Sequence, residues 1–154
     1  MKYAALVVGV DHYKKPLQDL NCAQFDAQNL YSFLAKNYTD GKVFMLLGND
    51  ATPQRIEEKT KEICRDLDPG DTFLFYYSGH GVQHNNKHYL IGAESEFDEF
   101  DQDWRKCVTV NLMISFSLRP GVQRLFIIDT CRNHLRIGSR AEYHADDARA
   151  RDVS

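Results

Sequence analysis

The sequence has no long hydrophobic run. Its two most apolar stretches, Ala4–Val10 and Thr72–Tyr77, are far shorter than the roughly 20 residues that a helix needs to cross a bilayer. The N-terminal run is also too short for the apolar region of a secretory signal, so we interpret it as a β-strand. These shortages predict a cytoplasmic protein with no membrane partner.

Positive charge and paired cysteines are also scarce. The chain has 19 Lys and Arg against 22 Asp and Glu, and this net charge of −3 does not favour a nucleic-acid partner. The four cysteines lie far apart, and the sequence contains no CxxC pair. We therefore expect reduced thiols rather than a disulfide framework. No strand is followed by a glycine-rich loop with Lys-Ser or Lys-Thr, which excludes a P-loop.

What remains is a chain of 154 residues with 43% hydrophobic and 27% charged residues, which fits one globular domain. Continuous apolar runs predict strands that are covered on both faces, as in a parallel sheet. They are Ala4–Val10, Val43–Leu47, Thr72–Tyr77 and Arg124–Asp129. Helical spacing of apolar residues predicts helices between them, over Leu20–Tyr38, Pro53–Leu67 and Val110–Leu118.

This order predicts an α/β fold, a doubly wound and mostly parallel sheet of about four core strands flanked by helices. An irregular excursion over Gly81–Thr109 interrupts the alternation and contains a short strand, Tyr89–Ile91. We expect the domain to span residues 1–136. Residues 137–154 are small, polar and charged, and we expect a flexible tail there.

Reactive side chains follow two of the predicted strands. Ser78, Gly79, His80 and Gly81 follow the third strand, and Cys131 follows the fourth. Ligands in open α/β sheets bind beyond the carboxyl ends of the strands, so His80 and Cys131 would share one rim. Each residue alone is more often structural. Together they predict a cysteine nucleophile with a histidine base, and the amides of Gly81 and Cys131 could hold an oxyanion.

His80 lies 51 residues before Cys131, close to the separation of about 50 residues that is typical of caspases. The matching stretches are ALVVGVDHY, LNCAQFDAQNL, FLFYYSGHGVQ, HYLIGA and LFIIDTCRNH, in order, between Lys2 and His134. On these motifs the chain resembles the caspase-like (clan CD) cysteine peptidases. It is most similar to the metacaspases and bacterial caspase domains, and to their large-subunit portion.

The resemblance implies a role for each matching residue. Cys131 matches the nucleophile, His80 its catalytic partner, and Gly81 an amide of the oxyanion hole. Asp129, Ser78 and Asp26 match the pocket for the substrate's P1 side chain. Acids in such a pocket favour a guanidinium or ammonium group, so we expect cleavage after Arg or Lys, with Arg preferred. The alternative for Asp129 is a carboxylate that caps the turn after its strand.

The chain departs from the family in two respects. Asn133 follows the Cys-Arg dipeptide where caspases have Gly, and the two strands of the small subunit are absent. The partner implied is therefore a small caspase subunit or segment, or a second copy. The tail then resembles the linker between subunits, where Arg140, Arg149 and Arg151 are candidate self-cleavage sites. A solvated linker is the alternative.

No cofactor is required by this chemistry, and we expect no metal. The three histidines His80, His84 and His88 recur every fourth residue, but the glycines around them argue against a helical metal site. Calcium is an alternative, because some metacaspases require it. The candidate ligands are Glu94, Glu96, Asp98, Glu99, Asp101 and Asp103, although a solvated acidic loop fits them better.

A role without catalysis is the rival hypothesis. Caspase folds also serve as interaction scaffolds, and a sheet that lacks its last strands has an exposed edge that favours pairing with another chain. The family also implies a neighbouring sensor or effector module and a role in bacterial defence. The two hypotheses differ in one observable, the hydrolysis of a polypeptide substrate after a basic residue.

Overall fold

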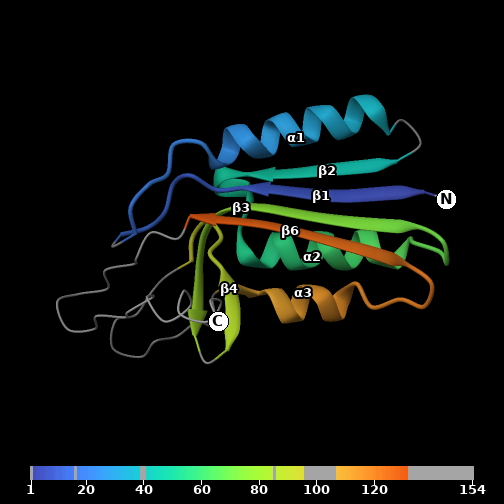
Figure 1. Ribbon diagram of the computed structural model, residues 1–154. Helices are drawn as coiled ribbons and strands as arrows, with labels where there is room; N and C mark the ends of the chain where they lie inside the picture. The colour runs from blue at the N-terminus through green and yellow to red at the C-terminus, as the bar shows by residue number, and fades with distance from the viewer. Residues whose placement is uncertain (1, 16, 39–40, 85, 96–106, 132–154) are drawn as a thin grey trace, which may run out of the picture.

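The computed structural model describes residues 2–15, 17–38, 41–84, 86–95 and 107–131, and at residues 84 and 131 it describes the backbone alone. Strands and helices alternate along the chain (Figure 1). The elements are β1 (Tyr3–Gly9), α1 (Ala23–Asn37), β2 (Lys42–Leu47), the 3-10 turn η1 (Gly48–Asp50), α2 (Pro53–Arg65), β3 (Thr72–His84), β4 (Lys87–Leu90), β5 (Val108–Thr109), α3 (Val110–Phe116) and β6 (Gln123–Cys131).

Four parallel strands form the centre of the sheet in the order β2-β1-β3-β6. They correspond to the four core strands that the apolar runs predict, so the α/β fold class is confirmed. Two antiparallel strands, β4 and β5, extend the sheet within the region expected to be irregular. The short strand predicted at Tyr89–Ile91 is β4, shifted toward the N-terminus and paired with the end of β3.

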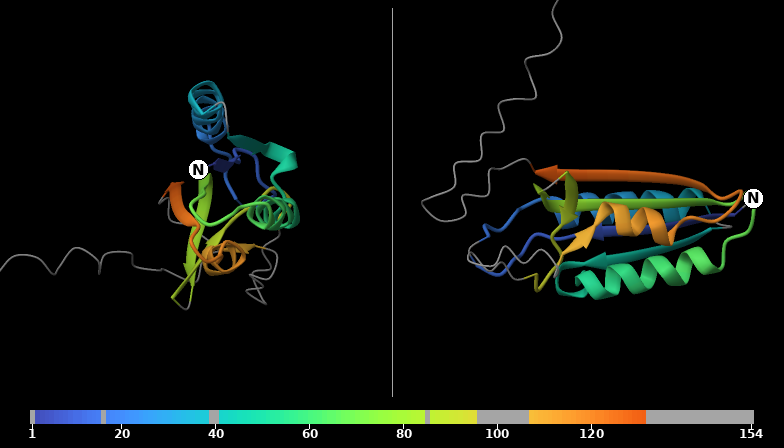
Figure 2. Two further views of the ribbon diagram at one scale, coloured as in Figure 1. Left: turned by 90° about the vertical axis from the view of Figure 1, so that its right-hand side faces the viewer. Right: turned by 90° about the horizontal axis from the view of Figure 1, so that it is seen from below.

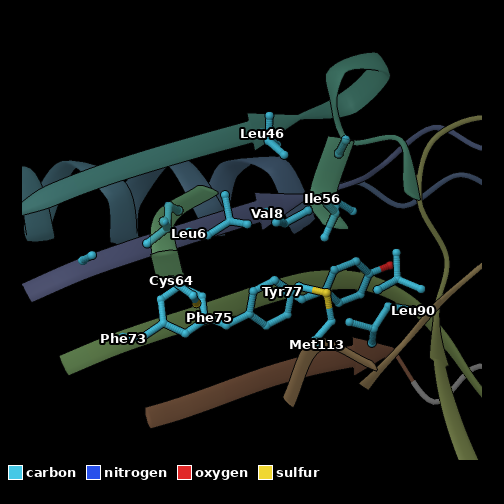
Figure 3. Packing of buried hydrophobic residues seen from close by; sticks show 14 of the residues in the cluster. Leu6, Val8, Leu46, Ile56, Cys64, Phe73, Phe75, Tyr77, Leu90 and Met113 are labelled. Atoms are coloured by element: carbon cyan, nitrogen blue, oxygen red, sulfur yellow. The ribbon is translucent and has the colours of Figure 1, made fainter. Parts of the chain in front are cut away.

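Helices cover both faces of the parallel strands (Figures 1 and 2). Successive side chains of a strand point to opposite faces, so Leu6 and Val8 join one core cluster, whereas Ala5 and Val7 join another. Helix α1 packs on the face of Ala5 and Val7. Helices α2 and α3 cover the opposite face, where Leu6, Ile56, Phe73, Phe75, Tyr77 and Met113 are buried (Figure 3).

Helix α2 begins where its sequence predicts. The Thr52 hydroxyl accepts a hydrogen bond from the backbone N–H of Arg55 at 3.3 Å, and Pro53 occupies the first turn. Its buried stripe contains Ile56, Thr60 and Ile63. Within the described ranges, no helix combines the length and the apolar character that crossing a bilayer demands.

Two strands are longer than predicted, and this changes the setting of the candidate site. Strand β3 runs to His84 and β6 runs to Cys131, so His80, Gly81 and Cys131 lie within strands rather than in loops after them. The prediction that these residues follow the ends of the two strands is therefore wrong. The polar and glycine residues stay extended because β6 pairs with β3 up to His80, and β4 pairs with β3 from Gly81 onward.

Asp71 ties three strands together at the amino end of the sheet. Its carboxylate accepts hydrogen bonds from the backbone N–H groups of Lys2 at 2.8 Å and Asp68 at 2.9 Å. Its carbonyl accepts the N–H of Gln123, where β6 begins. The hydrogen bond from Asp68, then that from Lys2, lowers the pKa of the Asp71 carboxyl below its usual value.

We expect Asp71→Asn to lower the midpoint of thermal unfolding at pH 7, because the amide loses one of these charge-assisted bonds. A carboxyl with a lowered pKa stabilises the fold above its unfolded pKa, and this contribution is lost as the pH falls through the folded pKa. The difference in the midpoint of thermal unfolding between the unaltered chain and Asp71→Asn should therefore become smaller below about pH 4. Circular dichroism melts across pH would measure it. Asp66→Asn, which removes an exposed carboxylate and its 3.9 Å surface ion pair with Lys42, is the control, and an equal loss in both variants would contradict the role of Asp71.

Candidate active site

The register of β3 and β6 makes the two residues of the predicted catalytic pair direct neighbours across the sheet. The two strands are parallel, and Ser78, Gly79 and His80 have Asp129, Thr130 and Cys131 as their respective partners. Neighbouring strands lie about 4.8 Å apart, so His80 and Cys131 are adjacent across the sheet. Both residues are at the carboxyl ends of their parallel segments, the edge at which ligands bind in such sheets.

The His80 imidazole is buried and held by a backbone carbonyl. Its Nε2 lies 2.7 Å from the carbonyl oxygen of Gln18. A carbonyl oxygen only accepts hydrogen bonds, so Nε2 must carry a proton in this arrangement. In neutral His80 the basic lone pair is then on Nδ1. The contact determines which nitrogen can take up a proton.

Gln18 lies in the loop between β1 and α1, and two carboxylates organise this loop. Asp11 accepts the backbone N–H groups of Ala23 at 2.8 Å and Gln24 at 3.2 Å, which are the first residues of α1. Asp19 contacts Nδ1 of His12 at 3.1 Å and accepts the N–H of Tyr13 at 3.1 Å. The hydrogen bond with His12, followed by that from Tyr13, lowers the pKa of the Asp19 carboxyl. The loop is therefore anchored on both sides of Gln18.

The three residues assigned to a P1 pocket are grouped around Tyr76. Ser78 and Asp129 are register partners, and Tyr76 lies two residues before Ser78 on the same face of β3. Burial raises the pKa of the Tyr76 hydroxyl, a hydrogen bond with Ser78 partly offsets this, and the charges of Asp129 and Asp26 raise the pKa further. Both carboxylates therefore act on the same phenol. Tyr76 itself packs with residues of α1.

Gly81 is required by close packing rather than by a turn. A Cβ atom at this position would lie 2.5 Å from Cγ2 of Thr130, which is nearer than two carbon atoms can approach. The glycine thus allows β6 to reach Cys131 beside β3. Gly81 also pairs with Leu90 of β4, so its backbone belongs to the hairpin that follows His80.

Other predicted residues fall partly outside the described chain. Arg140, Arg149 and Arg151, Asn133, and the acidic residues from Glu96 to Asp103 lie beyond the described ranges. Glu94 is described, and it is exposed with φ at 65°. Within the residues that the structure describes, no group of three or more His, Cys, Asp or Glu side chains is arranged to hold a metal.

Sequence reasoning missed three residues at this site: Gln18, Tyr13 and Tyr76. Tyr76 could have been found, because strand alternation places it on the face of Ser78. Gln18 could not, since it acts through a carbonyl group that every residue has. Tyr13 contacts His80 across 67 positions of sequence, with ring centroids 4.6 Å apart, and no local pattern indicates that contact.

Comparisons with known proteins identify the family of this chain. The sequence model of the caspase domain family matches residues 2–153. Metacaspase-1A of Aspergillus clavatus is 28% identical over 149 residues, which cover 86% of this chain and 34% of that protein. Metacaspase-1 of Botryotinia fuckeliana is similar to the same degree and over the same shares. The chain thus spans about a third of the length of these curated relatives.

A crystal structure of a protein from Geobacter sulfurreducens shares the fold, with a TM-score of 0.67 and 18% sequence identity. The match covers 85% of this chain and 51% of that one. The family match extends over nearly the whole sequence and includes the strands that carry His80 and Cys131. This chain belongs to the caspase domain family, and its similarity to the metacaspases defines its type within that family.

Proposed function

We propose that this chain is the large-subunit part of a cysteine endopeptidase that cleaves after basic residues, Arg in preference to Lys. One observation carries the proposal: His80 and Cys131 are register partners on adjacent parallel strands, and Ser78 and Asp129 are partners two residues earlier. The pairing puts a candidate nucleophile, its base and an acid for substrate selection at one end of the sheet. The metacaspase relatives support the same reaction class.

The proposed reaction is acyl transfer in two steps. The Cys131 thiolate attacks the scissile carbonyl carbon, and the amides of Gly81 and Cys131 stabilise the oxyanion. His80 donates a proton to the leaving amine as the C–N bond breaks, which leaves a thioester on Cys131. Water then attacks the thioester, His80 accepts a proton from it, and the thiolate leaves. Because Nε2 donates to Gln18, Nδ1 is the nitrogen that exchanges these protons. No step needs a cofactor.

The charge around Tyr76 supports selection of a basic P1 side chain. Asp129 and Asp26 both act electrostatically on this phenol, and Ser78 lies beside it. A guanidinium group can donate hydrogen bonds to two carboxylates and a hydroxyl at once, which favours Arg over the single point charge of Lys. An acidic P1 residue would meet charge of its own sign there.

The test is hydrolysis of short fluorogenic peptides that end in Arg, Lys or Asp. We expect turnover in the order Arg, Lys, Asp, with Asp near background. Cys131→Ala and His80→Ala should each reduce turnover by at least about 10³-fold, because these groups act as a unit in the chemical step. The unchanged chain should also lose its tail after Arg140, Arg149 or Arg151, whereas Cys131→Ala should keep it.

Cys22→Ala is the matched control, since Cys22 is an exposed thiol outside the proposed chemistry. The assay is run with and without calcium, and with and without a companion small segment of a metacaspase. Turnover of the Asp peptide would contradict the proposed P1 pocket while retaining the peptidase. Absence of turnover with the small segment present would contradict the peptidase.

Asp129→Asn tests substrate selection separately from the chemical step, because it changes a proposed pocket residue and leaves Cys131 and His80 in place. We expect the ratio of kcat/KM for Arg over a neutral P1 residue to fall by roughly tenfold to a hundredfold, because hydrogen bonds to charged groups contribute about 1.5–3 kcal/mol. Turnover of the neutral peptide should change little. Asp66→Asn, at the opposite end of the sheet, should leave the ratio unchanged. An unchanged ratio in Asp129→Asn would remove this carboxylate from the pocket.

A scaffold that pairs through its sheet edge is the second candidate, and β6 is the observation that favours it. Among the described strands, β6 pairs only with β3, so its other side carries backbone groups available for pairing. Leu125 and Ile127 on this strand are 49% and 40% exposed. A small caspase segment, or a second copy of the chain, would extend the sheet and cover these side chains.

The charged substitution Ile127→Lys separates the two candidates. We expect it to abolish association through β6, measured by sedimentation of the chain alone and with the small segment. Leu118→Lys, which adds the same single charge at an exposed apolar residue after α3, is the control. Association that survives Ile127→Lys would contradict pairing at this edge. A chain that associates without any Cys131-dependent hydrolysis would favour the scaffold.

A further inference from the structure

His80 lies between the part of β3 that pairs with β1 and the part that pairs with β4. Strand β1 pairs with β3 up to Gly9 and Ser78, and the N–H of Val10 still donates to the Ser78 carbonyl at 3.0 Å. Strand β4 takes over the same side of β3 from Gly81 onward. Residues of one parity along a parallel strand direct their backbone groups to one neighbour. The N–H of His80 therefore faces the side that β1 has just left.

The Tyr13 hydroxyl fills this place in the sheet. It accepts the backbone N–H of His80 at 2.8 Å and donates to the carbonyl of Val10 at 2.7 Å. A hydroxyl has one proton to donate and lone pairs to accept, so both contacts form together. The side chain thereby continues the hydrogen bonding between β1 and β3 by one more position. Its ring also contacts the imidazole of His80, with centroids 4.6 Å apart.

A second tyrosine, Tyr77, contacts the backbone carbonyl of His80. The Tyr77 hydroxyl lies 2.7 Å from the carbonyl oxygens of both His80 and Ile91. The N–H of Ile91 also donates to the His80 carbonyl, at 3.0 Å. Burial raises the pKa of the Tyr77 hydroxyl well above its usual value, so it remains a donor. Backbone restraints therefore hold His80 at its N–H and at its carbonyl.

Gly79 makes room for both hydroxyls. A Cβ atom at this position would lie 2.6 Å from the hydroxyl oxygen of Tyr13 and 2.6 Å from that of Tyr77. Any side chain here would displace the two tyrosines that hold the next residue. The glycine before His80 thus serves the packing of this pair.

We propose that Tyr13 is a positioning residue that orients His80 for proton transfer, and this inference rests on the proposed catalytic role of His80. Tyr13 and Gln18 belong to the same loop, so one segment contacts the backbone, the ring and Nε2 of His80. Asp19 accepts the N–H of Tyr13 and thereby couples the two contacts. Tyr13 acts through His80 and does not itself exchange a proton with the substrate.

The test removes the Tyr13 hydroxyl and keeps its ring. In Tyr13→Phe we measure the pH dependence of the rate at which iodoacetamide alkylates Cys131, by mass spectrometry of the intact folded chain. A base close to a thiol lowers the pH at which the thiolate forms. We expect the profile of Tyr13→Phe to shift toward the higher pH of His80→Ala. In peptide hydrolysis we expect kcat to fall about tenfold or more at unchanged KM, because small displacements of a catalytic group are costly.

Two controls accompany this measurement. Cys22 is exposed, so its alkylation in the same samples is the internal reference and should be the same in every variant. Tyr31→Phe removes a hydroxyl from a half-buried tyrosine of α1 and should leave the Cys131 profile unchanged. Thermal melts compare the stability of the two Phe variants.

The outcomes separate this inference from the proposed function. A shift in His80→Ala without one in Tyr13→Phe would overturn the positioning role and leave the peptidase intact. A Cys131 profile that does not respond to His80→Ala would overturn both. If Tyr13→Phe does not fold, NMR spectra of the unaltered, nitrogen-15-labelled chain test the inference instead. They should show His80 protonated at Nε2 and magnetisation transfer between the Tyr13 and His80 rings, and their absence overturns the inference.

Discussion

The parallel pairing of β3 with β6 is the constraint on which the candidate site depends. In a parallel pair each residue has one partner, and a slip by one residue would move every side chain of a strand to the opposite face. The register of His80 with Cys131 is therefore inseparable from that of the buried Phe75 with Phe126, which is partly buried and packs against the core. Burial of the aromatic side chains of β3 against α2 and α3 thus determines where the reactive pair lies. Each fully buried large side chain contributes about 1.5–3 kcal/mol to this arrangement.

The loop between β1 and α1 supplies the second part of the site, although it carries no reactive group that the mechanism uses. An imidazole buried in a sheet needs hydrogen-bond partners, and strand neighbours satisfy only backbone groups. From this loop, the Gln18 carbonyl provides a partner for Nε2 of the imidazole, and the Tyr13 hydroxyl provides one for the backbone N–H of His80. Asp11 and Asp19 hold the loop to α1 and to itself. These two carboxylates therefore support the loop that contacts the histidine.

The described part of the chain combines a buried half-site with an open edge. His80, Ser78 and Tyr76 are enclosed by the sheet and its loops, whereas Leu125 and Ile127 on β6 remain exposed. The chain spans about a third of the length of its metacaspase relatives. The peptidase and scaffold hypotheses differ in what covers β6. They share the same core and the same register.

The sequence by itself determined the order of elements, and it indicated His80 and Cys131 as the candidate reactive pair. Continuous apolar runs indicate buried strands whatever their neighbours are, and Thr52 with Pro53 marks a helix start through contacts within a few residues. The spacing of His80 and Cys131, with the flanking motifs, was enough to identify the family. Only the tertiary structure decided that β3 and β6 extend through these residues, because pairing with β4 and with each other keeps polar and glycine residues extended. It also decided that Tyr13 and Gln18 contact His80, since such contacts join residues more than sixty positions apart and leave no local pattern.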